Sequence, residues 1–216
     1  MRKFIKTALL VMTGLLLGAC DQSTVHFADE SSGNGACGPW YPGGGDLDSG
    51  PGFDIEEGAV FPCLVWESVR QHKEDTWLNI GDVYLSAKHG DISAKALVIV
   101  KVGLSCAGCH DLVVALSKRQ ADLEPVAAML ALTHGDAFYP DIAPLAEVES
   151  VIVDDEGWPA QWYLTNDAEN HFSDSRLVGI PWVTVVSLKD MRVISSSNSR
   201  FAASNVDELI ALIKGL

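Results

Sequence analysis

The stretch that most restricts the fold is an apolar run followed at once by two cysteines and a histidine. The run ALVIVKVGL, residues 96–104, has the length of a strand and is apolar enough to be buried on both faces. Cys106, Cys109 and His110 come directly after it in the letters CAGCH. Apolar residues then recur near helical spacing as far as position 123. We therefore expect a buried central strand that leads into a helix with the cysteines at its start.

The other segments alternate between the two kinds of secondary structure. The residue patterns predict strands at 148–153, 182–188 and 192–195, and helices at 126–132, 158–170 and 206–214, with Asn205 as the cap of the last helix. Residues 59–66 and 77–85 are predicted as the arms of an N-terminal β-hairpin, and the second arm leads into a short helix. Strands that alternate with helices favour an α/β fold with helices on both faces of the sheet.

The first twenty residues have the layout of an export signal. A basic start precedes an apolar run at 8–17, and small residues precede Cys20. Residues 17–20, LGAC, resemble the lipobox of bacterial lipoproteins, which implies that residues 1–19 are removed and that Cys20 carries the lipid anchor. An ordinary secretory signal that ends near Ala19 is the alternative. Either way we expect an extracytoplasmic chain, and the lipobox implies attachment to the periplasmic face of a bacterial membrane. Asp21 resembles an inner-membrane retention signal.

The charge of the chain argues against nucleic-acid partners. The formal net charge is −14, and without residues 1–19, which hold three basic and no acidic residues, 12 basic and 29 acidic residues leave −17. A surface of this sign repels phosphate backbones. We expect no binding of nucleic acid.

Residues 20–57 are predicted to form a tether, and residues 58–216 a folded domain. The first segment is rich in Gly, Ser, Asp and Pro and is too polar to bury a core of its own. Export favours disulfides, and once Cys20 is lipidated four cysteines are left. We expect a structural Cys37–Cys63 disulfide, although spacing alone does not establish connectivity.

Two chemical interpretations compete for CAGCH. In the first, Cys106 and Cys109 form a redox dithiol: the N-terminus of a helix stabilises the thiolate of Cys106, which attacks a disulfide, and Cys109 resolves the intermediate. In the second, both cysteines hold a c-type haem and His110 is its axial ligand. The buried strand ahead of the motif favours the dithiol, and neither Met129 nor Met191 is a convincing sixth ligand. In the dithiol interpretation, His110 is a solvated residue of the first helical turn.

A strand that ends in CxxC at the start of a helix resembles the thioredoxin-like fold. A second mark of that family is a cis-proline ahead of a strand, and residues 179–186, GIPWVTVV, match it at Ile180 and Pro181. The resemblance covers about residues 58–216, and the segment from Gly58 to Pro62 is similar to the entry of membrane-anchored bacterial redoxins. It implies a three-layer α/β/α sandwich with a mixed sheet and an N-terminal hairpin. It also implies that Pro181 and Ile180 dock an extended substrate segment.

The sequence departs from the family pattern between and after the cysteines. The family often has Trp before the first cysteine and Pro before the second, where this chain has Ser105 and Gly108, and Leu112 stands where many exported members have Glu. These residues tune the redox potential, so the direction of electron flow stays open. The Pro and Thr that peroxiredoxins place ahead of their reactive cysteine are not in register here.

The expected function is that of a thiol–disulfide oxidoreductase acting on protein disulfides through Cys106 and Cys109. We expect a monomer without a metal or dissociable cofactor, whose partners are protein thiol or disulfide substrates and an electron-transfer protein. The alternatives are a c-type haem protein, a zinc site that joins the CAGC cysteines to Cys37, Cys63, His72 or His171, and a redox-inactive binding module of the same fold. The acidic run at 154–156 is interpreted as a solvated strand end.

Overall fold

A computed structural model describes residues 37, 40–42, 55–133, 142–168, 171–172, 179–198 and 200–216. The predicted signal segment 1–19, Cys20 and most of the predicted tether lie outside these residues. In the described ranges, no helix combines the length and the apolar composition needed to cross a bilayer.

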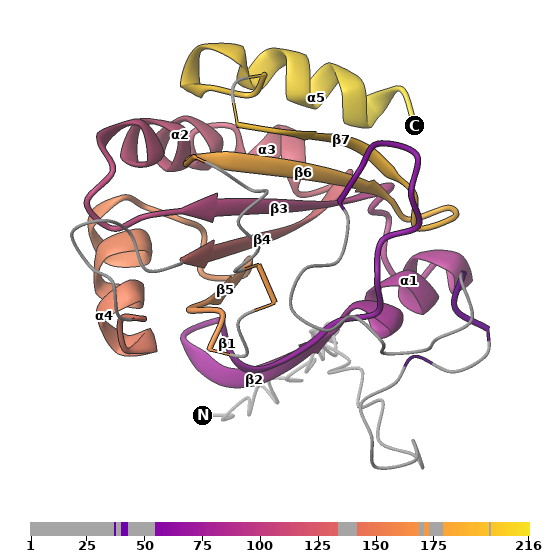
Figure 1. Ribbon diagram of the computed structural model, residues 1–216, viewed down its shortest axis with the longest axis horizontal. Coiled ribbons are helices and arrows are strands. Elements are labelled where there is room, and N and C mark those ends of the chain that lie inside the picture. The colour runs from indigo at the N-terminus through magenta and orange to yellow at the C-terminus, as the bar shows by residue number, and fades with distance from the viewer. Residues whose placement is uncertain are drawn as a thin grey trace, which may run out of the picture. The chain divides into compact units, whose positions relative to one another are not determined.

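A seven-stranded mixed sheet lies at the centre of the described part of the chain (Figure 1). Its strand order is β2-β1-β5-β4-β3-β6-β7. The neighbours β3, β4 and β5 are parallel, and the remaining neighbours pair antiparallel. The strands are β1 (Val65–Gln71), β2 (Glu74–Asn79), β3 (Ala96–Val102), β4 (Ala127–Thr133), β5 (Tyr163–Thr165), β6 (Trp182–Ser187) and β7 (Val193–Ser197).

Helices on both faces of the sheet divide the apolar side chains into two core clusters. Four α-helices and the π-helix η1 contribute to the first cluster, which we call the α2-side core, and α1 contributes to the second, the α1-side core. The predicted three-layer α/β/α arrangement is confirmed (Figure 1). The helices are α1 (Ile80–His89), α2 (Ala107–Ser117), α3 (Gln120–Leu123), α4 (Leu145–Glu149), η1 (Ser150–Asp155), the 3-10 helix η2 (Ala203–Asn205) and α5 (Val206–Lys214).

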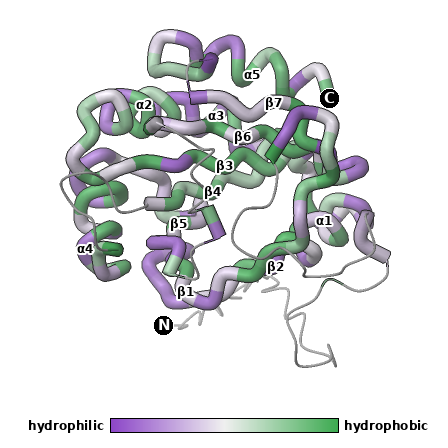
Figure 2. The backbone as a smooth tube through the Cα atoms, viewed as in Figure 1, coloured by the Kyte–Doolittle hydropathy of each residue, from purple (hydrophilic) through white to green (hydrophobic). Residues whose placement is uncertain are grey.

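The predicted central strand is confirmed as β3, and all seven of its residues are buried. Because successive side chains of a strand point to opposite faces, Val98 and Val100 enter the α2-side core while Leu97 and Ile99 enter the α1-side core. Figure 2 shows the hydrophobic colour along β3 and β4. Lys101 is a buried cation in this strand, and its Nζ donates to the backbone oxygen of Phe172 at 2.9 Å.

The helix predicted at 126–132 is wrong, because this segment is strand β4. Its alanines, leucine and methionine are good helix formers, which explains the error. In the fold the segment lies between β3 and β5 and is almost entirely buried, so the ladder and the packing on both faces outweigh local propensity.

The strand predicted at 148–153 is also wrong, because α4 and the π-helix η1 occupy this segment. Val148 and Ile152 are the buried residues, and their spacing of four places both on the inner face of a helix. The helix predicted at 158–170 is replaced by loops and the short strand β5. Trp158 and Trp162 are buried there and pack edge to face, with ring centroids 4.8 Å apart.

The N-terminal hairpin is present, but its strands begin and end elsewhere than predicted. The turn lies at His72 and Lys73, which both have positive φ and lack the usual Asn-Gly signature of such turns. The C-terminal hairpin β6–β7 and the final helix 206–214 are confirmed. Asn205 takes the cap position of that helix without a side-chain cap. Its Oδ1 accepts from the Ser204 hydroxyl and its Nδ2 donates to the backbone oxygen of Arg200.

Candidate functional site

The two cysteines of CAGC lie where β3 passes into α2. Cys106 is the N-cap residue of α2, and its Sγ accepts from the backbone N–H of Cys109 at 3.2 Å. The two residues form a disulfide with their Cα atoms 5.2 Å apart. The Cys109 N–H group and the positive end of the helix dipole therefore face the Cys106 sulfur, an arrangement that stabilises a thiolate over a thiol.

The two sulfurs differ in their access to solvent. Cys106 is partly exposed, whereas Cys109 is 1% exposed and packs in the α2-side core with Leu112 and Val113. The backbone N–H of Gly103 also lies 3.5 Å from the Cys109 sulfur. A partner molecule can therefore reach Cys106, while Cys109 can be reached only through Cys106.

A cis-proline faces this pair. The Ile180–Pro181 bond is cis, and the Ile180 carbonyl oxygen lies 3.9 Å from the Cys106 sulfur. The Pro181 ring lies beside the dithiol loop, since its Cδ is 3.7 Å from where a Cβ on Gly108 would stand. Both residues immediately precede β6, whose Trp182 pairs with Lys101 near the end of β3. Antiparallel pairing of β3 with β6 thus brings Cys106, Cys109, Ile180 and Pro181 together.

His110 and Glu156 lie next to this site, and the dithiol interpretation predicted a contribution from neither. The Nδ1 atom of His110 lies 3.0 Å from Oε1 of Glu156, whose side chain is 7% exposed. Burial raises the pKa of the Glu156 carboxyl, while the hydrogen bond and charge of His110 lower it. The acidic run at 154–156 is therefore not a solvated strand end at its last residue. No sequence spacing links the two residues, because a tertiary contact joins α2 to the end of η1.

Cys37 and Cys63 form a second disulfide, in the α1-side core. Their Cα atoms are 5.8 Å apart, and the residues are 2% and 4% exposed. The neighbouring Trp40 stacks on Tyr84 of α1, and the Tyr41 hydroxyl donates to the Phe61 carbonyl oxygen at 2.8 Å. This disulfide pins the described residues near position 40 against α1 and is remote from the CAGC site in the core packing.

The described surroundings of Cys106 and Cys109 restrict the two alternative cofactors. A haem bonded to both sulfurs would need space beside Cys109, which is enclosed by the core. Among the described residues, no three His, Cys, Asp or Glu side chains gather as a metal site. Cys37 and Cys63, proposed above as zinc partners of the CAGC cysteines, lie in the other core cluster.

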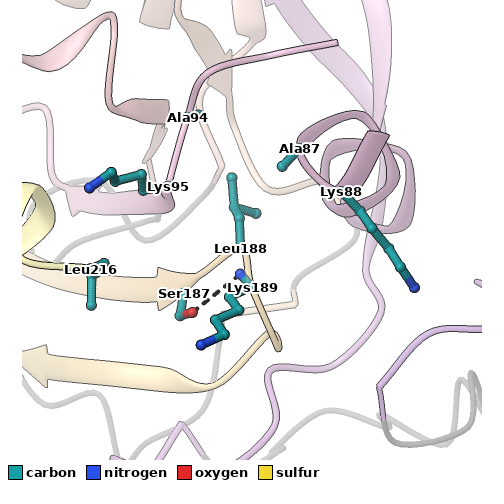
Figure 3. A pocket seen from close by; sticks show the side chains of 8 residues that line it. All are labelled: Ala87, Lys88, Ala94, Lys95, Ser187, Leu188, Lys189 and Leu216. Atoms are coloured by element: carbon teal, nitrogen blue, oxygen red, sulfur yellow. Dashed lines mark hydrogen bonds between the residues drawn. The ribbon is translucent and has the colours of Figure 1, made fainter. Parts of the chain in front are cut away.

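A pocket of about 330 Å³ lies beyond the opposite end of β3 from the dithiol (Figure 3). Lys88, Lys95 and Lys189 are among its lining residues, but Lys88 points away from the other two in Figure 3. The Lys95 ammonium donates to the Lys214 carbonyl oxygen, and the Lys88 ammonium lies over the Tyr84 ring. The lysines therefore do not converge on an anion.

Comparison with known proteins identifies the fold. The chain matches no protein-family model and no curated protein. A similar solved structure is that of a protein assigned as a disulfide isomerase from Bacteroides thetaiotaomicron, with a TM-score of 0.52 and 11% identity over 74% of this chain and 89% of that one. Thioredoxin peroxidase I of Plasmodium yoelii has a TM-score of 0.52 and 10% identity over 74% of this chain and 90% of its own. A peroxidoxin of Mycobacterium tuberculosis has a TM-score of 0.51 and 12% identity over 76% of this chain and 99% of its own. The fold is thioredoxin-like.

Proposed function

We propose that this protein is a thiol–disulfide oxidoreductase and that Cys106 and Cys109 are its redox-active pair. The observation that carries the proposal is the contrast between the sulfurs: Cys106 is accessible at a helix N-terminus beside cis-Pro181, and Cys109 is buried behind it. A disulfide that only holds the fold together has no need for one accessible sulfur among free N–H donors.

The exchange reaction divides into two sulfur-to-sulfur transfers. The Cys106 thiolate attacks one sulfur of a substrate disulfide; a mixed disulfide forms, and the other substrate sulfur leaves as a thiolate. Cys109, after losing its proton, attacks the Cys106 sulfur and releases the second substrate thiolate. The substrate gains two electrons, and the protein is left with the Cys106–Cys109 disulfide, which is the oxidised state seen here. The same steps in reverse oxidise a substrate dithiol.

The segment ahead of β6 supplies the docking edge in this proposal. The cis bond directs the Ile180 carbonyl oxygen toward the Cys106 sulfur, at 3.9 Å. An extended peptide carrying the substrate disulfide can pair with this backbone, which is the β-addition mode of peptide recognition. Pro181 keeps its ring beside Gly108, so the docking edge lies beside the two residues that separate Cys106 from Cys109.

The test compares exchange by the wild type with exchange by single cysteine variants. We expect Cys106→Ser to lose insulin reduction by on the order of 10³-fold, because no accessible nucleophile is left. Cys109→Ser should accumulate the mixed disulfide, which mass spectrometry of the trapped adduct detects. A Cys37→Ser/Cys63→Ser variant is the matched control and should retain exchange. Full activity of Cys106→Ser would refute the assignment of the nucleophile.

Three further measurements separate the remaining alternatives. Haem absorbance of the purified protein would favour the c-type interpretation, and absence of both haem and exchange activity would favour a binding module. The structural neighbours bear names of both a disulfide isomerase and peroxidases, so a peroxide-consumption assay belongs beside the exchange assay. A measured reduction potential assigns the direction of electron flow.

We also propose that Cys20 anchors the protein to the periplasmic face of a bacterial membrane. The LGAC sequence at 17–20 supports this, since more than one acyl chain on that cysteine suffices for stable attachment. Expressed from the full-length gene in bacteria, the wild type should incorporate labelled palmitate and sediment with membranes. Cys20→Ser should do neither. Membrane attachment of Cys20→Ser without label would contradict the anchor.

A further inference from the structure

A buried carboxylate that contacts His110, the residue after Cys109, has one oxygen without a hydrogen-bond partner among the described residues. Glu156 is 9% exposed; its Oε1 meets His110 Nδ1 at 3.0 Å, and its Oε2 has no partner among the described residues. Leaving a buried acceptor unpaired costs stability, so such a group calls for an explanation. The side chain that contacts this carboxylate, His110, lies in the first turn of α2.

The backbone that holds Glu156 is unusual. It follows the π-helix η1, and its N–H donates to the Val151 carbonyl oxygen at 3.0 Å, in the i to i−5 pattern. Gly157, with φ of +79°, then turns the chain away. π-Helices are rare and concentrate at functional sites. Here the π-helix brings a carboxylate from a distant part of the sequence to His110, the residue that follows Cys109.

His110 connects this carboxylate to the sulfurs. It directly follows Cys109 in α2, and its N–H donates to the Cys106 carbonyl oxygen at 3.1 Å. Helical side chains lean toward the N-terminus of the helix and cover the preceding turn. We therefore expect the His110 imidazole to lie over the turn that begins at Cys106. Its side chain is 55% exposed and can exchange protons with solvent, whereas Glu156 cannot readily do so.

Among the residues that the structure describes, few other charges act on His110 and Glu156. Within η1, Asp155 precedes Glu156 and raises the pKa of its carboxyl, and Asp154 is ion-paired with Lys73 of the β1–β2 turn at 3.0 Å. Asp111 follows His110 on α2 and is exposed. Ile180 and Pro181, which approach the dithiol from the start of β6, carry no charge.

We propose that His110 and Glu156 form a proton-accepting pair whose titration is coupled to the redox state of Cys106 and Cys109. The inference rests on the proposed function. A dithiol partner that becomes a disulfide releases two electrons and two protons. The electrons break the Cys106–Cys109 bond; one proton goes to the Cys109 sulfur, and the other goes to the pair. The products are the Cys106 thiolate, the Cys109 thiol and a protonated pair, so atoms and charge balance.

Coulomb attraction gives the coupling its sign. In the oxidised protein the site has no thiolate, and the unprotonated pair carries the charge of Glu156 alone. Reduction adds a second negative charge one helical turn away, which raises the affinity of the pair for a proton on the order of tenfold. By linkage, a protonated pair favours reduction by the same factor. The factor by which reduction raises the proton affinity of the pair must therefore equal the factor by which protonation favours reduction. Two independent measurements test this equality.

The first measurement uses the wild-type protein. NMR titration of the His110 side chain, assigned through its correlations with the backbone resonances of the wild type, is carried out before and after selective reduction of the Cys106–Cys109 disulfide. We expect the midpoint to move to higher pH on reduction, by on the order of tenfold in proton affinity. His89, which lies at the end of α1, is the internal control and should not move. An identical His110 midpoint in both states would overturn the proposal.

The second measurement is the equilibrium constant with glutathione between pH 5.5 and 8.5. The ratio of wild type to His110→Gln should change on the order of tenfold from high to low pH, equivalent to about 30 mV for two electrons. Glu156→Gln should move the transition to lower pH, because the carboxylate that holds the proton on the imidazole is gone. His89→Gln and Glu147→Gln, at exposed positions, are the matched controls. A ratio that is constant with pH would overturn the coupling.

The two hypotheses fail in different ways. If the wild type does not equilibrate with glutathione, the proposed function fails, yet chemical reduction still permits the His110 titration. If exchange proceeds but the profiles of wild type and His110→Gln superimpose, only the proton coupling fails. A variant that does not fold leaves the wild-type titration as the deciding measurement.

Discussion

The two cores of this protein each contain one disulfide and one buried carboxylate, and they use them differently. In the α1-side core, Cys37 and Cys63 are both buried. The Asp167 carboxylate there accepts from Trp66 Nε1 and from the backbone N–H groups of His171 and Phe172. In the α2-side core, Cys106 reaches solvent and Glu156 keeps an unpaired oxygen. The same chemical groups thus serve structure when enclosed and fully bonded, and are available for chemistry when accessible and incompletely bonded.

The largest expected effect separates the disulfides by stability. A Cys37→Ser/Cys63→Ser variant should lose about 3–4 kcal/mol in free energy of unfolding, since this bond closes a loop with a sequence separation of 26. The Cys106→Ser/Cys109→Ser variant should lose about 2 kcal/mol or less, since its separation is 3. Urea denaturation measures both. Equal losses would break the distinction between a structural and an exchanging disulfide.

Two glycines test the packing around each disulfide. A Cβ on Gly81 would stand 2.5 Å from the Cys37 sulfur and 2.9 Å from the Trp40 ring, so Gly81→Ala should cost about 1–3 kcal/mol. A Cβ on Gly108 meets only Pro181 Cδ, at 3.7 Å, and Gly108→Ala should leave stability unchanged or slightly raised. Thermal unfolding compares them. A neutral Gly81→Ala would show that the α1-side disulfide region is loosely packed.

Stepwise reduction should open the disulfides in order. The equilibrium constant for reduction by dithiothreitol should be at least about tenfold larger for Cys106–Cys109 than for Cys37–Cys63, because enclosed structural disulfides have the lower reduction potentials. Alkylation followed by peptide mass mapping at increasing dithiothreitol identifies which cysteines react first. Simultaneous labelling of all four would contradict the comparison.

The smallest expected effect is a difference in pH dependence. Burial raises the pKa of Asp167, and hydrogen bonds from Trp66 and the backbone partly oppose this. The folded state therefore binds this proton more tightly than the unfolded state. The contribution of Asp167 to stability is full below about pH 3.9 and is lost as pH rises through the folded pKa, by at most about 1.4 kcal/mol per pH unit. Asp167→Asn should flatten that slope in urea denaturation at pH 4–7. An unchanged slope would show that Asp167 is not its source.

Much of the fold could be predicted because its signals are local. The apolar run at 96–102, the hairpin at 182–197 and the amphipathic helix at 206–214 each carry their periodicity within a few residues. The errors fell where tertiary contacts outweighed propensity. The segment 126–132 was predicted as a helix, but residues 127–133 form a strand because β3 and β5 enclose them. The segment 148–153 was predicted as a strand, but it is helical because two apolar residues share one inner face.

In the candidate site, too, some residues could be found from local motifs and others only from the tertiary structure. Its two sulfurs and its proline stand in short motifs that can be located in the sequence, whereas Glu156 gave no signal. It lies in an acidic run that resembles any solvated loop, and only the packing of η1 against α2 buries it beside His110.

The sequence by itself determined where a disulfide between near neighbours could form, and that a strand and a helix meet there, because spacing and periodicity act over a few residues. Only the tertiary structure decided which sulfur is accessible, which carboxylate is buried and which segments pair as strands. Burial and hydrogen bonding depend on residues far apart in the chain, and these interactions set the free energies that distinguish one environment from another.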